Sequence, residues 1–269
     1  MNDTNSWNCK QTPAGNSIKD LGKIIFTAGL CVALVAITGR AQVASEIIRK
    51  SEELLKGKTC QGTFLMRVTT PHYTREMKME SWWVGNEKAL IVIRSPKKES
   101  GNKTLKIGNE IWSYLRNTET TIRIPPSMML QSWNGSDFTN DDLVRESSLV
   151  DDYRLSVAGE EDHGGKVCWK VVLDPKPDAA VVWGKLIYWV SVKEYLPTEV
   201  RYFDEKDRLI RTIFYSDIKT LGGRRLPTKW TVINEVKEGH TTEFIMENVQ
   251  FDVPISDRLF SYRELEKGD

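Results

Sequence analysis

The sequence predicts a mainly β protein whose large curved antiparallel sheet forms an unclosed β-barrel, with helices covering the concave face. Apolar and polar residues alternate along about ten or eleven segments between Gly62 and Phe251, which is the pattern of strands with one polar face. Turn residues separate these segments at intervals of about eight to twelve residues. A sheet of this length curls, and two apolar segments outside the strands need a concave face to cover.

Residues 1–41 have the layout of a secretory signal peptide. Three lysines precede an apolar run over residues 24–37, and this run is short for a helix that spans a bilayer. The small residues Gly39 and Ala41 predict cleavage after Ala41. We therefore expect export of the chain, with residues 42–269 forming a single domain.

Charge and cysteine content limit the function classes. The chain has a formal net charge of +1 and no block of lysines or arginines, which argues against nucleic acid as a partner. Two cysteines remain after loss of the leader, Cys60 and Cys168. In an oxidising compartment they either form a disulfide or stay as buried thiols, because the sequence does not fix the distance between their Cα atoms.

The first element after the leader is an amphipathic helix over residues 43–55. Its apolar residues, which include Val43, Ile47 and Ile48, recur at helical spacing, and Gly57 provides a stop. Alternation then takes over along the rest of the chain, and glycine-containing turns such as Gly108-Asn109 separate the predicted strands.

Two early strands predict which side chains face the interior. Phe64 and Met66 share one face of the strand over residues 62–68, while the polar residues lie on the other face. In the next strand, Met77, Met79 and Trp83 share a face. One polar face and one apolar face are typical of a sheet that covers something on a single side.

The segment over residues 122–143, here named the central segment, is apolar but does not alternate. It combines Met128, Met129, Trp133 and Phe138 with proline, glycine and other turn residues. Such a segment is either a lid that fills the core or the mouth of an apolar pocket. Methionine side chains adapt to irregular partners, although a methionine-rich stretch more often fills a core.

The central segment also carries a family resemblance. The stretch SWNGSDFTNDDL at residues 132–143 resembles a hallmark of the outer-membrane lipoprotein-sorting protein family, the LolA-like periplasmic carriers. The resemblance extends from about Val43 to Leu265. Supporting motifs follow in the expected order: Gly159-Glu160, Cys168-Trp169, Asp174-Pro175-Lys176, Trp183-Gly184-Lys185, Tyr195-Leu196-Pro197, Tyr202-Phe203-Asp204-Glu205, the stretch 223–228 and VPISDRLF at residues 253–260.

The resemblance implies the LolA/LolB-like unclosed barrel and a hollow that holds acyl chains of a lipoprotein or lipid. It also implies a periplasmic location, with an inner-membrane transporter as a candidate partner. A hydrocarbon chain gains about 0.8 kcal/mol per buried methylene, so its carrier needs a dry cavity lined by bulky apolar groups. The candidate lining residues are Phe64, Met66, Met77, Met79, Trp83, Trp112, Tyr114, Met128, Met129, Trp133, Phe138, Trp183 and Trp189.

Catalytic and metal-binding constellations are missing from the sequence. His72, His163 and His240 have no zinc-site spacing, so we expect surface or turn positions for them. The carboxylates around residues 137–152 lack calcium-loop spacing, and we expect Asp137 to cap a turn or short helix at Phe138. No nucleophile elbow or phosphate loop occurs. We therefore predict no enzyme activity, no metal and no cofactor.

Two function classes follow from this reasoning. In the first, the protein carries or presents a lipidated ligand in the periplasm. In the second, the same scaffold is a sensor or an accessory subunit of an envelope transporter, and it binds another protein instead of lipid. An open apolar cavity beneath the central segment favours the first class, and a pocket filled by the protein's own side chains favours the second.

Overall fold

The computed structural model describes residues 42–145, 149–179 and 181–267. The predicted signal peptide and its cleavage after Ala41 lie outside the described residues. The described residues form one compact unit. The description below concerns this unit.

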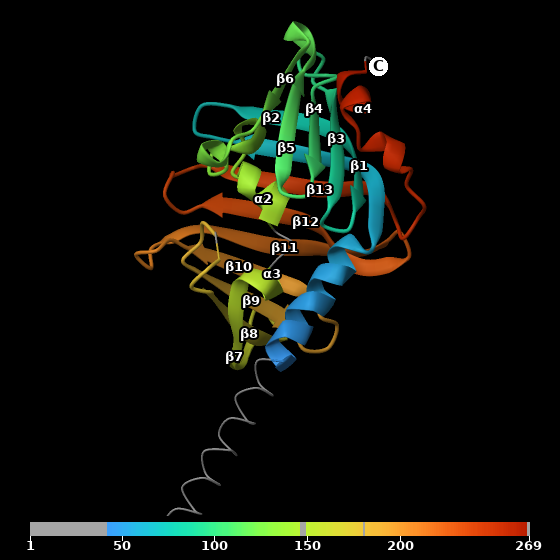
Figure 1. Ribbon diagram of the computed structural model, residues 1–269. Helices are drawn as coiled ribbons and strands as arrows, with labels where there is room; N and C mark the ends of the chain where they lie inside the picture. The colour runs from blue at the N-terminus through green and yellow to red at the C-terminus, as the bar shows by residue number, and fades with distance from the viewer. Residues whose placement is uncertain (1–41, 146–148, 180, 268–269) are drawn as a thin grey trace, which may run out of the picture. The chain divides into compact units, whose positions relative to one another are not determined.

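A single antiparallel sheet dominates the unit and contains 13 strands (Figure 1). Strands that are consecutive in the chain pair with each other, except for β6 and β7, and β1 also pairs with β13. The strands are β1 (Thr59–Thr69), β2 (Thr74–Val84), β3 (Lys88–Ser95), β4 (Lys103–Ile107), β5 (Glu110–Leu115), β6 (Thr120–Arg123), β7 (Tyr153–Asp162), β8 (Val167–Pro175), β9 (Lys185–Ser191), β10 (Pro197–Phe203), β11 (Leu209–Leu221), β12 (Arg224–Asn234) and β13 (Thr241–Phe251).

The two free edges of the sheet are β6 and β7, which are consecutive in the chain. All other consecutive strands pair, so closure of the barrel fails at one place only in the described chain. At that place the sequence turns from alternation to the central segment, with two prolines at its start. Since proline and irregular patterning do not support a strand, the unclosed sheet that the sequence predicts is confirmed.

Short helices replace strands along and beside the opening. The turn before β6 is η1 (Arg116–Thr118), and the central segment contains η2 (Pro126–Met128), η3 (Trp133–Gly135) and most of α2 (Asn140–Arg145). A further helix, α3 (Leu149–Asp152), leads into β7. Asn134 inside η3 has a left-handed backbone with φ of 48°, which asparagine tolerates better than most residues.

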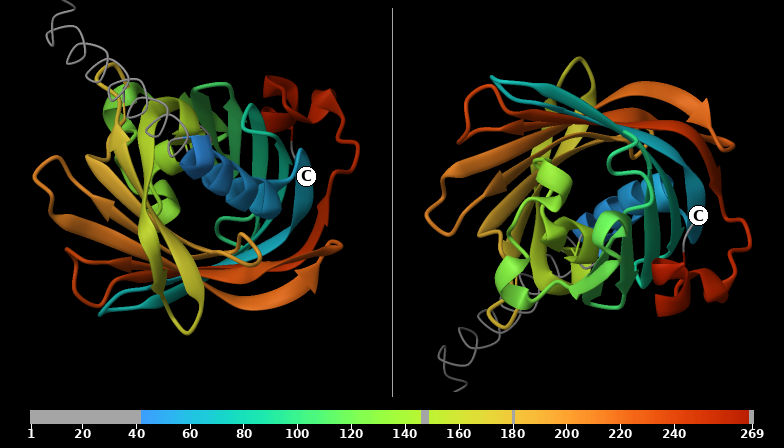
Figure 2. Two further views of the ribbon diagram at one scale, coloured as in Figure 1. Left: turned by 90° about the horizontal axis from the view of Figure 1, so that it is seen from below. Right: turned by 90° about the horizontal axis from the view of Figure 1, so that it is seen from above.

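A longer helix over residues 42–56 crosses the hollow of the curved sheet (Figure 2). Its buried residues Ala44, Ile47, Ile48, Ser51 and Leu55 follow the i, i+3, i+4, i+7 pattern. This spacing places them on one side of a helix. The amphipathic helix that the sequence predicts is confirmed.

The concave side contains two apolar clusters. The first cluster joins the early part of this helix to α3 and strands β7–β12, with Ile48, Leu173 and Leu186 among its buried members. The second cluster joins Leu55 to strands β1–β3, β12 and β13 and to the central segment, and it includes Met66 and Trp133.

A third cluster covers the outer face of strands β3–β5. The C-terminal segment, with η4 (Asp257–Leu259) and α4 (Tyr262–Glu266), brings Phe260 and Leu265 onto this face. Strand β3 is therefore buried on both faces, with Ile91 on the concave side and Leu90 on the outer side. Double burial explains the continuous apolar run of β3, where alternation is lost.

Candidate functional site

An apolar cavity lies beneath the central segment, between the end of the helix over residues 42–56 and the concave face of the sheet. The centre of a water-sized sphere can reach about 90 Å³ of this space. The wall is almost entirely apolar and aromatic. Its residues are Leu55, Lys56, Cys60, Phe64, Met79, Ser81, Trp83, Gly85, Ile91, Trp133, Phe138, Asp142, Leu143, Trp230, Phe244 and Met246.

The sheet wall of the cavity contains a row of aromatic rings from neighbouring strands. Trp230 of β12 lies between Tyr215 of β11 and Phe244 of β13, with ring centroids 5.6 Å and 5.2 Å away. Phe244 stacks in turn on Phe64 of β1 at 5.2 Å, and Phe138 of the central segment meets Phe244 edge-on at 6.2 Å. These rings supply large, rigid apolar surface to the cavity.

Polar contacts fix the central segment over this wall. The indole Nε1 of Trp133 donates to Thr104 Oγ1 at 3.2 Å. The carboxylate of Asp137 accepts hydrogen bonds from Thr242 Oγ1 at 2.8 Å and from Asn234 Nδ2 at 2.9 Å. Asp137 therefore binds side chains of β12 and β13, and the expectation that it caps a turn at Phe138 is wrong. The hydroxyl of Ser136 accepts from the Phe138 amide instead.

A buried ion pair anchors α2 to β11. Asp142 receives two hydrogen bonds from the guanidinium of Arg211, at 2.5 Å and 2.6 Å, and the side chains are 10% and 4% exposed. The guanidinium also lies 4.0 Å from the ring centroid of Tyr202 and 4.7 Å from that of Trp183. Burial by itself would lower the pKa of Arg211, but the adjacent Asp142 outweighs burial and raises it.

The same ion pair marks the border between the two clusters. Asp142 lines the apolar cavity and also a smaller one, of about 30 Å³, on the side of Trp183, Tyr202 and Leu186. Because a bidentate pair between buried groups has a fixed geometry, it holds the central segment in one position across this border.

Five of the predicted lining residues surround the cavity. They are Phe64, Met79, Trp83, Trp133 and Phe138. Their contact with a ligand stays a prediction.

Four other candidates lie near the cavity but not on its wall. Met66 and Met77 are fully buried members of the second cluster. Met128 and Met129 are half-buried at η2, away from the lining residues. Of the apolar residues predicted in the central segment, Trp133 and Phe138 line the cavity and the two methionines do not.

The structure places the remaining four candidates elsewhere. Trp112 and Tyr114 lie in the third cluster, on the outer face of β5, and Trp183 packs against the first cluster. Trp189 is buried on the outer face of β9, because its neighbours Tyr188 and Val190 take the concave side. Alternation of apolar and polar residues shows which side chains of a strand share a face. When both faces are buried, it does not show which of them is on the concave side of the sheet.

Sequence reasoning missed most of the far wall of the cavity. Ile91, Leu143, Trp230, Phe244 and Met246 line it together with the predicted residues. The sequence pattern could have identified three of them. Trp230, Phe244 and Met246 stand at the alternate positions of their strands that carry the buried residues. Arg211 occupies the same phase as Ile213 on β11, and a lone arginine there indicates a buried charge that needs a partner.

Cys60 and Cys168 are both free and buried. Cys60 lies on the cavity wall, where burial raises the pKa of its thiol to about 12. Cys168 lies on the outer face of β8 beside Thr198, at 3.7 Å. Of the two alternatives that the sequence left open, the structure has the buried thiols.

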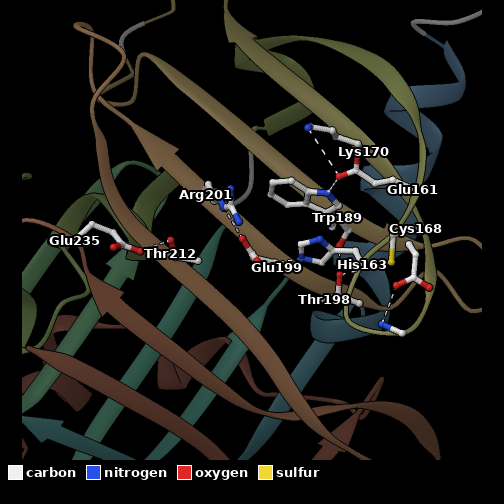
Figure 3. Close-up of polar contacts among 12 residues, drawn as sticks. Glu161, His163, Cys168, Lys170, Trp189, Thr198, Glu199, Arg201, Thr212 and Glu235 are labelled. Carbon is white, nitrogen blue, oxygen red and sulfur yellow. Dashed lines mark hydrogen bonds and ion pairs between the residues drawn. The ribbon is translucent and has the colours of Figure 1, made fainter.

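The outer face of β7–β10 contains a dense polar cluster (Figure 3). His163, in the turn between β7 and β8, stacks on Trp189 with ring centroids 4.6 Å apart. Its Nε2 lies 2.7 Å from the buried carboxylate of Glu199, which also accepts from Arg201 at 2.5 Å. The indole of Trp189 donates to Glu161. These contacts hold the β7–β8 hairpin against the sheet.

Within the described parts of the chain, no group of three or more histidine, cysteine or acidic side chains is arranged to hold a metal ion. In the same residues, no helix combines the length and apolarity needed to span a bilayer.

Solved structures, among them one of a LolA superfamily protein, share the fold of this chain. The fold is similar to a DUF1329 family protein from Desulfovibrio piger, with a TM-score of 0.76 and 22% identity over 84% of this chain and 99% of the other. A LolA superfamily protein from Nitrosomonas europaea is similar with a TM-score of 0.71 and 20% identity, over 82% of this chain and 99% of the other. A putative outer membrane lipoprotein-sorting protein domain from Vibrio parahaemolyticus is similar with a TM-score of 0.74 and 19% identity, over 84% of this chain and 100% of the other.

A family model with the description "-like: Uncharacterized protein" matches residues 85–267. This match covers more than half of the chain, which therefore belongs to that family. No curated protein matches the chain. The resemblance to LolA-like proteins that the sequence predicts is confirmed, with the LolA-type fold.

Proposed function

We propose that this protein binds an acyl chain of a lipid or lipoprotein in the cavity beneath the central segment and carries it through the periplasm during lipoprotein sorting. The observation that supports this proposal is the cavity itself. It is lined by aromatic and aliphatic side chains, it lies under an irregular segment, and it belongs to a fold with lipoprotein-sorting relatives. Binding rather than catalysis fits a wall that offers so few polar groups.

The volume of the cavity indicates how binding proceeds. The centre of a water-sized sphere can reach about 90 Å³ of the cavity. Each methylene group that a ligand buries there contributes about 0.8 kcal/mol. A chain too long for this space requires the cover of the cavity to move outward. Apart from Ile122 and Arg123, which pair with β5, the central segment pairs with no strand of the sheet in the described chain.

The small volume also favours one alternative, in which the protein is a sensor or accessory subunit of an envelope transporter and carries nothing. In that case the cavity is a packing defect, and the functional surface lies elsewhere. The two functions differ in ligand content, because only a carrier takes up free hydrocarbon chains.

Mass spectrometry of organic extracts from gently purified protein tests the proposal, together with titration of a fluorescent fatty acid. We expect co-purifying acyl species and saturable uptake of the fluorescent probe. Absence of both results would contradict the carrier function and support the alternative.

A further inference from the structure

A second hollow, here named the outer hollow, lies on the outer face of the sheet where β2, β1 and β13 are neighbours. The centre of a water-sized sphere can reach about 260 Å³ of it, compared with about 90 Å³ in the apolar cavity. The proposed carrier function does not use this space. Its lining residues are Gln61, Gly62, Thr63, Glu80, Trp82, Asn248 and Gln250.

Alternation along the strands separates the outer hollow from the apolar cavity. Cys60 of β1 and Trp83 of β2 line the cavity, whereas their neighbours Gln61 and Trp82 line the outer hollow. Successive side chains of a strand point to opposite faces of the sheet. The two spaces therefore lie on opposite sides of the same strands, and each can be tested without the other.

The strand register arranges the side chains of the outer hollow in two rows. One row is Trp82, Gln61 and Gln250, and the other is Glu80, Thr63 and Asn248. After Thr63 the register between β1 and β13 shifts, so that Glu247 has no partner on β1. Such a bulge bends a strand and is common beside binding sites.

The charge of the lining distinguishes the outer hollow from the rest of these strands. Further along, Arg67 of β1 pairs with Glu76 of β2 at 2.6 Å and with Glu243 of β13 at 2.8 Å. Among the described residues that line the outer hollow, Glu80 is the single ionised one, and it pairs with Arg94 at 2.9 Å. Amides and a hydroxyl group take the place of the ion pairs, which indicates a ligand with neutral polar groups.

The amides offer both hydrogen-bond donors and hydrogen-bond acceptors. Gln61 Nε2 donates to Gln250 Oε1 at 2.8 Å, which leaves the amide oxygen of Gln61 as an acceptor and the amide nitrogen of Gln250 as a donor. Asn248 and Gln250 are exposed, so a ligand can reach them. Trp82 adds an apolar ring that is half-buried because it packs against the third cluster.

We propose that the outer hollow binds a neutral oligosaccharide. Sugar hydroxyl groups both donate and accept, so they match the amides of Gln61, Asn248 and Gln250, and the C–H face of a sugar ring packs against Trp82. An acidic sugar would bring a second negative charge close to Glu80. An extended peptide is recognised mainly through backbone pairing at a strand edge, whereas this lining consists mainly of side chains on the face of a sheet.

NMR titration of the ¹⁵N-labelled protein with three neutral trisaccharides tests the inference. The probes are cellotriose, maltotriose and triacetylchitotriose. With at least one of them, we expect saturable shifts of the side-chain amide signals of Gln61, Asn248 and Gln250. Absence of shifts with all three, or shifts confined to residues outside the outer hollow, would overturn the inference.

One variant and one matched control show whether the amides make the contact. Gln250→Ala removes an amide from an exposed position and should weaken binding of the best trisaccharide about three- to tenfold, as for loss of one hydrogen bond. Gln131→Ala removes an exposed amide from the central segment and should leave binding unchanged. Equal affinities of the two variants would contradict the assigned site.

Two further probes test the class of the ligand. Trigalacturonic acid should bind about fivefold more weakly than the best neutral trisaccharide, because its carboxylates meet Glu80, and trialanine should cause no shifts. Shifts with trialanine and none with the sugars would assign the outer hollow to a peptide and overturn the inference. Uptake of a fluorescent fatty acid should be the same in Gln250→Ala and the wild type, so the carrier function is tested separately.

Discussion

The two clusters on the concave side use the same sheet and the same helix, yet only the second contains the larger cavity. In the first cluster, Ala44, Ile47 and Ile48 of the helix are buried together with fully buried side chains of β8 and β9. In the second, only the end of the helix, at Leu55, reaches the sheet, and the central segment provides the rest of the cover.

This difference shows how the fold separates stability from binding. A regular helix packs its side chains closely along its length. An irregular segment of 3₁₀ turns has no such periodicity, and it covers the sheet with two large rings, Trp133 and Phe138. The first cluster therefore stabilises the unit, and the second keeps space for a ligand.

The largest effect should come from the ion pair at the border of the clusters. Arg211→Leu leaves Asp142 buried without a counter-charge, so we expect the free energy of unfolding to fall by about 3–5 kcal/mol. Urea denaturation provides the measurement. The control Arg225→Leu removes an exposed partner of Glu194 and should change stability by less than about 1 kcal/mol. Equal effects would show that the Arg211 pair does not anchor the central segment.

Truncation should distinguish the two clusters directly. Leu173→Ala opens a new cavity in the close-packed first cluster, and we expect a loss of about 3–4 kcal/mol. Met79→Ala enlarges a space that already exists, so we expect a smaller loss, about 2 kcal/mol. Thermal and urea unfolding of both variants provide the comparison. A loss for Met79→Ala as large as that for Leu173→Ala would mean that the second cluster is equally well packed.

Filling the cavity should abolish binding and preserve stability. Leu143→Trp introduces a large ring from α2 into the cavity, and we expect uptake of a fluorescent fatty acid to fall at least about tenfold, with a gain or loss of stability below about 1 kcal/mol. Leu130→Trp makes the same change in the same segment at a residue that is 60% exposed. Reduced uptake in both variants would indicate a general effect of tryptophan and not occupation of the cavity.

The smallest effect should come from the outer face. His163→Gln loses a hydrogen bond to Glu199 and a stacked ring on Trp189, so we expect a loss of stability of about 1 kcal/mol. Uptake of the fatty acid should be unchanged because this cluster lies on the opposite face from the cavity. A change in affinity measured by fluorescence titration would show that the two faces are coupled.

The two apolar segments outside the strands predicted that the sheet does not close. The alternation of apolar residues predicted the sheet itself and which residues of β1 and β2 are buried. It succeeded because these strands have one buried and one polar face, as Phe64 and Met79 illustrate. The helix over residues 42–56 was predictable for the same reason, since a single apolar stripe defines its buried side.

The placement of tryptophans was not predictable in the same way. Trp112 and Trp189 satisfy the alternation on strands whose outer faces are also buried, the first by the C-terminal segment and the second by the β7–β8 hairpin. Cover of this kind depends on contacts between residues far apart in sequence. The pair of Asp142 and Arg211 is likewise a tertiary contact that local pattern does not encode.

Photo-crosslinking with a diazirine-bearing fatty acyl ester, followed by peptide mass spectrometry, tests most directly which cluster receives the ligand. We predict crosslinks to residues around the cavity, with Phe64, Met79 and Leu143 among them, and loss of these crosslinks in Leu143→Trp. Crosslinks confined to Leu173, Leu186 and other residues of the first cluster, or scattered over the outer face, would contradict the assignment of the cavity as the binding site.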